Sequence, residues 1–187
     1  MKQRSALLIG LVVLGALTRL IPHDPNFTSM GAVAIFAAFT VRRTSLAYLA
    51  PVAAILLSDI GLYLADENYW FGWINLFVLA AFCMTVFGSR YLGKATPEKV
   101  GAGALGSSVV FFIVTNFGVW ITGGGLGYSM TFAGLGEAYV AGIPFFWNTL
   151  LSTVLYSGCL FGALKLAESA IPGVRAESAT AGTLYSV

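Results

Sequence analysis

The chain has 187 residues, of which 58% are hydrophobic and only 10% are charged, and its formal net charge is +2. Soluble domains carry about 25% charged residues, and a chain of this length cannot hide so much apolar surface from water. The composition therefore excludes a water-soluble domain and predicts an all-α integral membrane protein in a lipid bilayer. The small net charge, without any basic run, also argues against nucleic-acid binding.

The first predicted membrane helix covers residues 6–18, after a short basic segment. A cleaved signal peptide is the alternative, but no A-x-A site follows the apolar run and the rest of the chain is equally apolar. We therefore expect this helix to be retained. Ala6 and Gly10 form a small-xxx-small pair that would let another helix approach closely, although both residue types are common in membrane helices.

A polar island, residues 19–28, separates the first apolar run from the second and contains His23, the only histidine. Pro22 and Pro25 lack a backbone N–H, and each pushes the preceding residue toward extended geometry. Irregular backbone is not tolerated against lipid. We therefore expect a rigid, non-helical connection that lies in water or lines a polar cavity.

Five further apolar segments complete a predicted six-helix bundle, namely 29–40, 46–64, 71–88, 101–121 and 143–166. The segment 29–40 is short for a full span of about 20 residues, so we expect it to begin partway into the membrane. The Gly-rich connection 123–142 is the longest, and a short interfacial helix is one form it can take. Residues 1–167 would form the membrane domain and 168–187 a polar, frayed tail.

The distribution of Lys and Arg predicts the orientation of this bundle. With six spans, nine of the ten basic residues fall on one side: Lys2, Arg4, Arg42, Arg43, Arg90, Lys94, Lys99, Lys165 and Arg175. Only Arg19 falls on the other side. The positive-inside rule then places both termini in the cytoplasm of a multi-pass protein, which we expect in a bacterial inner membrane.

The three outer connections hold most of the unusual polar and aromatic residues, which predicts an outward-facing binding pocket. The alternative is that these loops are polar only because they touch water. The candidate ligand-binding residues are His23, Asn26, Asp59, Tyr69, Trp70, Trp73, Asn116, Trp120, Tyr128 and Asn148. The two asparagines Asn116 and Asn148 could equally form hydrogen bonds across the bundle.

Asp59 interrupts the third apolar segment, where a charge costs about 2.5–3.5 kcal/mol at mid-membrane and usually marks function. Arg19 should lie at a similar depth, so the two residues can form an ion pair. That pair would clamp the first and third helices together. A direct contact between Asp59 and a ligand is the alternative.

Cys83 and Cys159 lie in separate apolar runs and lack the spacing of a metal site. We expect Cys83 to act as a small hydrophobe or, as a thiolate, to ligate the cobalt of a corrinoid. The sequence has no H-E-x-x-H, G-x-S-x-G or P-loop motif, so we do not expect an enzyme. The alternatives are an enzyme that modifies its ligand through Cys83 and a structural subunit of a membrane complex.

Four segments resemble a DUF6580-type family of bacterial membrane proteins: 19–28, 57–59, 115–120 and 143–150. Its members look like the substrate-binding S components of energy-coupling factor (ECF) vitamin transporters, and the BtuM-like group of proposed vitamin B12 transporters is a branch. The resemblance implies an S-component fold that captures a vitamin-type ligand, cobalamin first, on the outer side and mediates its uptake. No intrinsic cofactor is implied.

The resemblance also implies a partner and points to one departure from the family pattern. S components often dock on an ECF energising module through small residues of the first helix, here Ala6 and Gly10, whereas some relatives act alone. In the B12-binding branch, a cysteine near the outer end of the third and fourth helices would meet cobalt. Here Trp73 stands near that end, and Cys83 lies more than two helical turns further inward.

Overall fold

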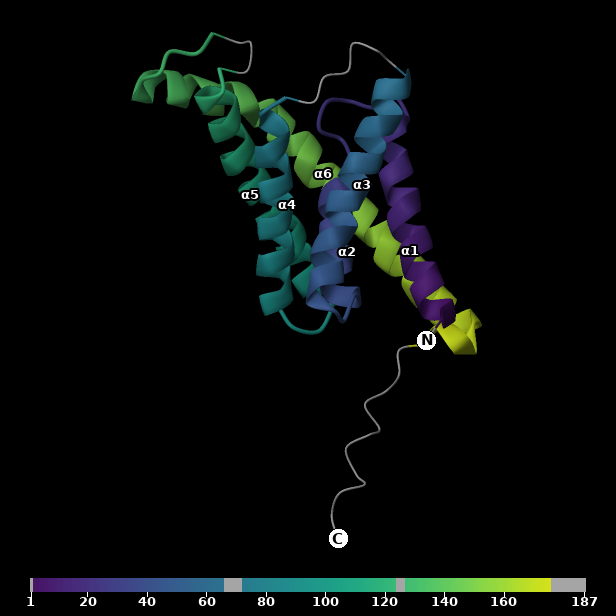
Figure 1. Cartoon of the computed structure of the whole chain (residues 1–187). Coiled ribbons are helices and arrows are strands. Elements are labelled where there is room, and N and C mark those ends of the chain that lie inside the picture. The colour runs from purple at the N-terminus through teal and green to yellow at the C-terminus, as the bar shows by residue number, and fades with distance from the viewer. Residues whose placement is uncertain (1, 66–71, 124–126, 176–187) are drawn as a thin grey trace.

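The computed structural model describes residues 2–65, 72–123 and 127–175. Within these ranges the chain forms six α-helices and two short 3-10 turns. The elements in order are α1 (Lys2–Leu17), η1 (Thr18–Leu20), α2 (Met30–Thr40), α3 (Thr44–Ala65), α4 (Ile74–Tyr91), α5 (Pro97–Ile121), α6 (Phe132–Ala170) and η2 (Pro172–Val174) (Figure 1).

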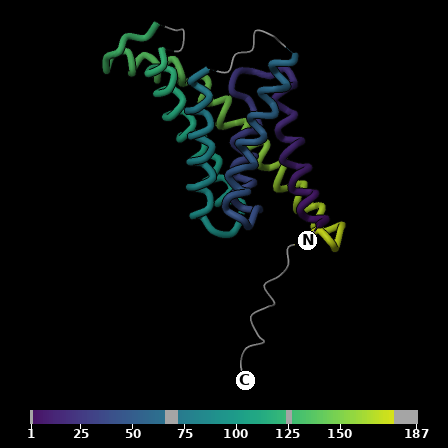
Figure 2. Tube along the Cα trace, viewed as in Figure 1, coloured from purple at the N-terminus to yellow at the C-terminus, as the bar shows by residue number. Residues whose placement is uncertain are grey.

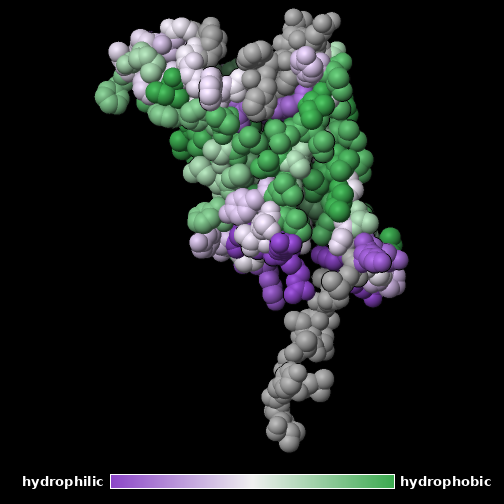
Figure 3. All heavy atoms as spheres, in the orientation of Figure 1, coloured by the Kyte–Doolittle hydropathy of each residue, from purple (hydrophilic) through white to green (hydrophobic). Residues whose placement is uncertain are grey.

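All of the α-helices except α2 are long and apolar enough to cross a membrane, five in total. Figure 3 shows a broad apolar band across the visible face of the bundle, with hydrophilic residues gathered at the end where the N-terminus lies. The predicted all-α membrane bundle is confirmed at this level. The described part of the chain begins and ends at the same end of the bundle (Figures 1 and 2).

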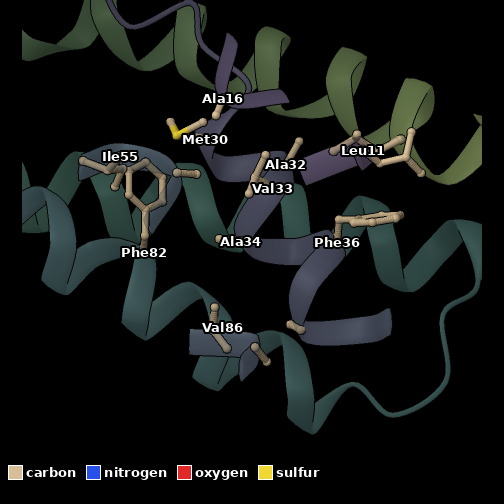
Figure 4. Packing of buried hydrophobic residues seen from close by; sticks show 14 of the residues in the cluster. Leu11, Ala16, Met30, Ala32, Val33, Ala34, Phe36, Ile55, Phe82 and Val86 are labelled. Atoms are coloured by element: carbon tan, nitrogen blue, oxygen red, sulfur yellow. The ribbon is translucent and has the colours of Figure 1, made fainter. Parts of the chain in front are cut away.

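The short helix α2 forms the centre of the bundle and packs against all five other helices. Every residue from Met30 to Ala38 is buried, so α2 has no face for lipid. Its 11 residues are about 16 Å long, roughly half of the hydrocarbon core. Figure 4 shows Ile55 of α3 and Phe82 of α4 close together on one side of α2 and Phe36 on the other, where its ring meets that of Phe161 of α6 with centroids 5.2 Å apart.

The connection between η1 and α2 is non-helical, as predicted, and its end is buried within the bundle. Ser29 is fully buried and donates its hydroxyl to the carbonyl oxygen of Gly15 over 2.6 Å. Asn26 has a φ of 62°, the left-handed conformation that asparagine tolerates better than most residues. The loop therefore re-enters the protein before α2 begins partway along the bundle.

Helix α6 begins earlier than predicted, because Phe132–Ala170 is one helix of 39 residues. A helix does occur in the connection 123–142, as one of the expectations allowed, but it is continuous with the helix expected from residue 143. Thr131 caps its first turn by accepting a hydrogen bond from the Gly134 amide over 3.2 Å. Pro144 lies inside the helix, where a proline bends a helix without always ending it. Figures 1 and 2 show the first turns lying across the end of the bundle and the rest running diagonally along it.

Arg90 stabilises the end of the bundle at which α2 ends and α3 begins, because it closes the turn between these two helices. Its guanidinium donates to the carbonyl oxygens of Val41 (3.1 Å) and Arg42 (3.2 Å) and to the hydroxyl of Thr44 (3.2 Å). Carbonyl groups at a helix C-terminus lack partners within the helix, and a cation there also interacts favourably with the negative end of the helix dipole. Arg90 thus fixes the lower end of the central helix.

The predicted frayed tail is ordered in its first part. Helix α6 continues past Glu168 to Ala170, and Val174 of η2 is buried. Arg4 of α1 forms an ion pair with Glu168 and donates a hydrogen bond to the Val174 carbonyl oxygen over 2.9 Å. These contacts hold the end of α6 against α1, whereas residues 176–187 lie outside the described residues.

Candidate functional site

A partly open cavity of about 210 Å³ lies between α4, α5 and α6, at the end of the bundle opposite the two termini. Asn26 of the first loop and Tyr128 of the connection before α6 complete its wall. Apolar and aromatic side chains form most of the lining. The residues that line the cavity are Asn26, Ile74, Val78, Phe111, Phe112, Thr115, Asn116, Val119, Tyr128, Ala138, Ala141, Gly142, Phe145, Phe146 and Thr149.

Asn116 of α5 reaches the cavity because Gly142 of α6 leaves room for its amide. A Cβ atom at Gly142 would lie 2.3 Å from Asn116 Oδ1, closer than any real contact. Asn116 Nδ2 donates to the carbonyl oxygen of Phe112, one turn earlier in α5, over 2.8 Å. The amide is therefore held in one orientation, with its Oδ1 against the backbone of α6.

Two threonines give the cavity further polar atoms. Thr115 donates its hydroxyl to the Phe111 carbonyl oxygen over 2.7 Å, and Thr149 donates to the Phe145 carbonyl oxygen over 2.9 Å. Each residue is almost fully buried. A hydroxyl has one proton and two lone pairs, so both threonines keep acceptor capacity after these bonds form.

Three hydrogen bonds between elements hold the rim of the cavity. Asn148 Nδ2 donates to the Pro25 carbonyl oxygen over 3.0 Å and joins α6 to the first loop. Trp120 Nε1 donates to the Ser129 carbonyl oxygen over 2.9 Å and joins the end of α5 to the segment before α6. Tyr139 donates to the Ile113 carbonyl oxygen over 2.9 Å. The first and third of these bonds join residues 123 and 26 positions apart in the sequence.

Beside the cavity lies a polar cluster around the predicted ion pair, and Arg19 and Asp59 do form that pair. Arg19 also donates to the Ser58 hydroxyl over 2.9 Å, and Asn75 Nδ2 donates to Asp59 Oδ2 over 3.2 Å. The Asp59 side chain is only 5% exposed, so these partners replace the water that a buried carboxylate loses. Asn75 directly follows Ile74, which lines the cavity.

The family to which the chain belongs is shown by a match over most of its length. The profile of a family described as "Family of unknown function (DUF6580)" matches residues 1–174. The chain belongs to this family. The comparisons with curated proteins and with solved structures find no match.

The structure of this DUF6580 member divides the predicted site residues into three groups. Asn26, Asn116 and Tyr128 line the cavity. Asp59, Trp120 and Asn148 lie outside the lining and belong to the hydrogen-bond networks around it. The remaining candidates among the described residues are exposed: Trp73 is 76% exposed, and His23 Nδ1 lies 2.9 Å from the Asp24 carbonyl oxygen. Tyr69 and Trp70 lie outside the described residues.

Several lining residues were not predicted from the DUF6580 sequence. Thr115 and Thr149 adjoin the predicted residues Asn116 and Asn148, but threonine occurs in many apolar helices and gives no signal of its own. Asn75, which bonds Asp59 and is not among the lining residues, does carry a signal, because it is a polar residue within the first turn of a mostly apolar helix. The four phenylalanines of the lining are typical of any membrane helix.

Cys83 of α4 is half-buried and is not among the residues that line the cavity, while Cys159 of α6 is exposed. Among the described residues, no group of three or more His, Cys, Asp or Glu side chains is placed to hold a metal ion. The cobalt role of Cys83 stays a prediction. On α1 of this DUF6580 member, Ala6 is exposed, and a Cβ atom at Gly10 would meet open space.

Proposed function

We propose that this chain binds a vitamin-type micronutrient in the cavity between α4, α5 and α6 and mediates its uptake across a bacterial inner membrane. The observation that carries the proposal is the cavity itself. It combines aromatic walls with a few amide and hydroxyl groups, the composition typical of small-molecule sites. The cavity lies at the end of the bundle remote from every basic residue except Arg19, which is the end that the positive-inside rule assigns to the outer side.

The volume of the cavity favours a micronutrient smaller than cobalamin. An apolar cavity of about 150 Å³ in another protein holds benzene, whereas sites for drug-sized ligands measure about 300–1,000 Å³. At about 210 Å³, this cavity is closer in volume to the one that holds benzene than to the sites for drug-sized ligands. A corrinoid, with its macrocycle and long side chains, is several times larger, so the cavity favours a smaller micronutrient over cobalamin.

Uptake by this chain would follow the S-component resemblance of its motifs. The sequence has no P-loop, so energy would come from a partner, or uptake would be facilitated and followed by trapping. Ala6 and Gly10 face away from the bundle on α1, and we propose this surface for docking on an energising module.

The test is a screen of water-soluble vitamins, cobalamin included, for compounds that raise the melting temperature of the purified protein. A ligand that binds only the folded state raises its stability in proportion to the logarithm of its concentration over its Kd. Ala141→Phe should abolish the shift by filling the cavity, whereas Val140→Phe, on the neighbouring residue outside the lining, should leave it intact.

The same pair of variants tests uptake. Cells that express the wild-type chain or Val140→Phe should accumulate the stabilising compound, and cells that express Ala141→Phe should not. A stabilising compound whose binding and accumulation are equal in both variants would contradict the assignment of the cavity. If no vitamin in the screen stabilises the protein or accumulates, the proposed function is wrong.

A further inference from the structure

We propose that the cavity selects an uncharged, flat ligand, of one aromatic ring or a small fused pair, that supplies its own N–H or O–H hydrogen-bond donors. This inference rests on the proposed function and names the chemical class of its ligand. It follows from three properties of the cavity, which are its size and walls, its charge, and the state of its polar side chains.

The size and the walls of the cavity define the shape of the ligand. A volume of about 210 Å³ exceeds that of a cavity which holds benzene, but only by an amount equal to about two water molecules. The walls carry aromatic rings, and Phe112 of α5 meets Phe146 of α6 edge to face, with ring centroids 5.6 Å apart. Aromatic rings stack on or meet the edges of such side chains, so a flat ring suits these walls better than a branched chain.

The charge of the lining determines the charge of the ligand. None of the described residues that line the cavity is an Asp, Glu, Lys, Arg or His. Arg19 and Asp59, in the polar cluster beside the cavity, already form a pair with each other. An ionised ligand would lose its hydration at the apolar walls without meeting an opposite charge there, which disfavours binding.

The state of the polar side chains determines which hydrogen bonds the ligand must supply. The hydroxyl protons of Thr115 and Thr149 are used by carbonyl oxygens of their own helices, so both side chains offer only lone pairs. Asn116 donates one of its two N–H groups to its own helix and keeps Oδ1 as an acceptor and the second N–H as a donor. The buried part of the site therefore presents more acceptors than donors, namely two hydroxyl oxygens and Oδ1 against one amide N–H, and a ligand with matching donors satisfies the acceptors.

Benzamide, N,N-dimethylbenzamide and benzoate test these properties one at a time. Benzamide is flat, uncharged and has two N–H donors, the dimethyl compound lacks the donors, and benzoate carries a charge. The full chain, purified in detergent, is titrated with each compound while its melting temperature is recorded. We expect benzamide to raise the melting temperature and the other two compounds to bind at least fivefold more weakly, about the effect of one lost hydrogen bond.

Threonine-to-valine variants connect the effect to the proposed acceptors. Thr149→Val keeps the shape of the side chain but removes its oxygen, and it should weaken benzamide binding about fivefold, as should Thr115→Val. Thr40→Val is the matched control, because Thr40 makes the same bond to its own helix, to the Phe36 carbonyl oxygen over 2.6 Å, at the far end of the bundle. It should bind benzamide as the wild type does.

The inference is overturned if benzoate or the dimethyl compound binds as tightly as benzamide, if none of the three binds, or if both threonine variants at the cavity behave like Thr40→Val. These failures differ from a failure of the proposed function. A chain that accumulates a charged micronutrient through the cavity would refute the ligand class alone. A chain that binds benzamide as expected, but accumulates no vitamin in cells, would refute the uptake function alone.

Discussion

Asn148 of α6 donates a hydrogen bond from Nδ2 to the carbonyl oxygen of Pro25 over 3.0 Å, and the two residues lie 123 positions apart in the chain. The bond connects the last helix to the loop that follows the first. Asn26, the next residue, lines the cavity in a left-handed conformation. The position of this part of the cavity wall therefore depends on a side chain from the other end of the sequence.

Replacing Asn148 should loosen the first loop and weaken ligand binding. Asn148→Ala removes one side-chain hydrogen bond to a carbonyl group, so the free energy of unfolding should fall by about 0.5–1.5 kcal/mol. Asn148→Asp keeps the shape but has no N–H to donate, and it should show a similar loss. Denaturant titration in detergent measures both variants. If Asn148→Asp is as stable as the wild type and binds ligand equally well, the bond does not hold the loop.

A methyl group at Gly142 should disrupt the cavity, whereas the same change at Gly136 should not. In Gly142→Ala the new Cβ would lie 2.3 Å from Asn116 Oδ1, so the amide or the helices must shift. We expect the free energy of unfolding to fall by about 1–3 kcal/mol and ligand binding to be lost. At Gly136, also in α6, a Cβ meets no atom within 4 Å, and Ala should stabilise the helix by about 0.5–1 kcal/mol. Thermal unfolding of the two variants, compared side by side, would show opposite signs.

Single replacements in the Arg19–Asp59 pair should be costly, and a double replacement should recover part of the loss. Asp59→Leu leaves the Arg19 guanidinium without its carboxylate, and breaking a buried pair from one side typically costs about 3–5 kcal/mol. Arg19→Met likewise leaves the buried Asp59 carboxylate without its guanidinium partner. In the variant with both changes no buried charge of the pair remains, so its loss should be smaller than the sum of the two. Additive losses in this double-mutant cycle would show that the pair is not coupled.

Arg90 should be replaceable neither by methionine nor by lysine. A lysine keeps the charge but lacks the planar, forked donors that reach the carbonyl oxygens of Val41 and Arg42 together. We expect Arg90→Lys to lose about 1.5–3 kcal/mol, because the lost hydrogen bonds involve a charged group. Arg43→Lys, at an exposed position of the same end, serves as the control and should unfold as the wild type does.

Much of the helical framework could be predicted from the sequence, because the segments between apolar runs are marked by charges, prolines and glycines. The beginning of α6 could not. Gly134, Gly136 and Pro144 suggest a loop when they are read singly, but the Thr131 cap and the packing of Gly134 against the backbone of Ser129 start a helix there. Helix propensity is a weak guide where tertiary contacts decide the outcome.

Only part of the candidate site could be predicted, again because tertiary contacts decide which side chains meet. The pairing of Arg19 with Asp59 follows from two charges at one depth in an apolar chain, because each is too costly to leave alone. The choice between Trp120, which holds the rim, and Tyr128, which lines the cavity, depends on which way each side chain points. Thr115 and Thr149 matter only because three helices bring them to one space, and a single sequence does not show which helix faces meet.

The most direct test of the central claim, that the cavity binds a small micronutrient, is mass spectrometry of the molecules that co-purify with the protein from its native membrane. We expect a small aromatic compound in near-equal molar amount with the wild-type chain and with Val140→Phe, and its loss from Ala141→Phe, in which the cavity is filled. A corrinoid bound to the wild type, or a compound retained equally by Ala141→Phe, would contradict the claim.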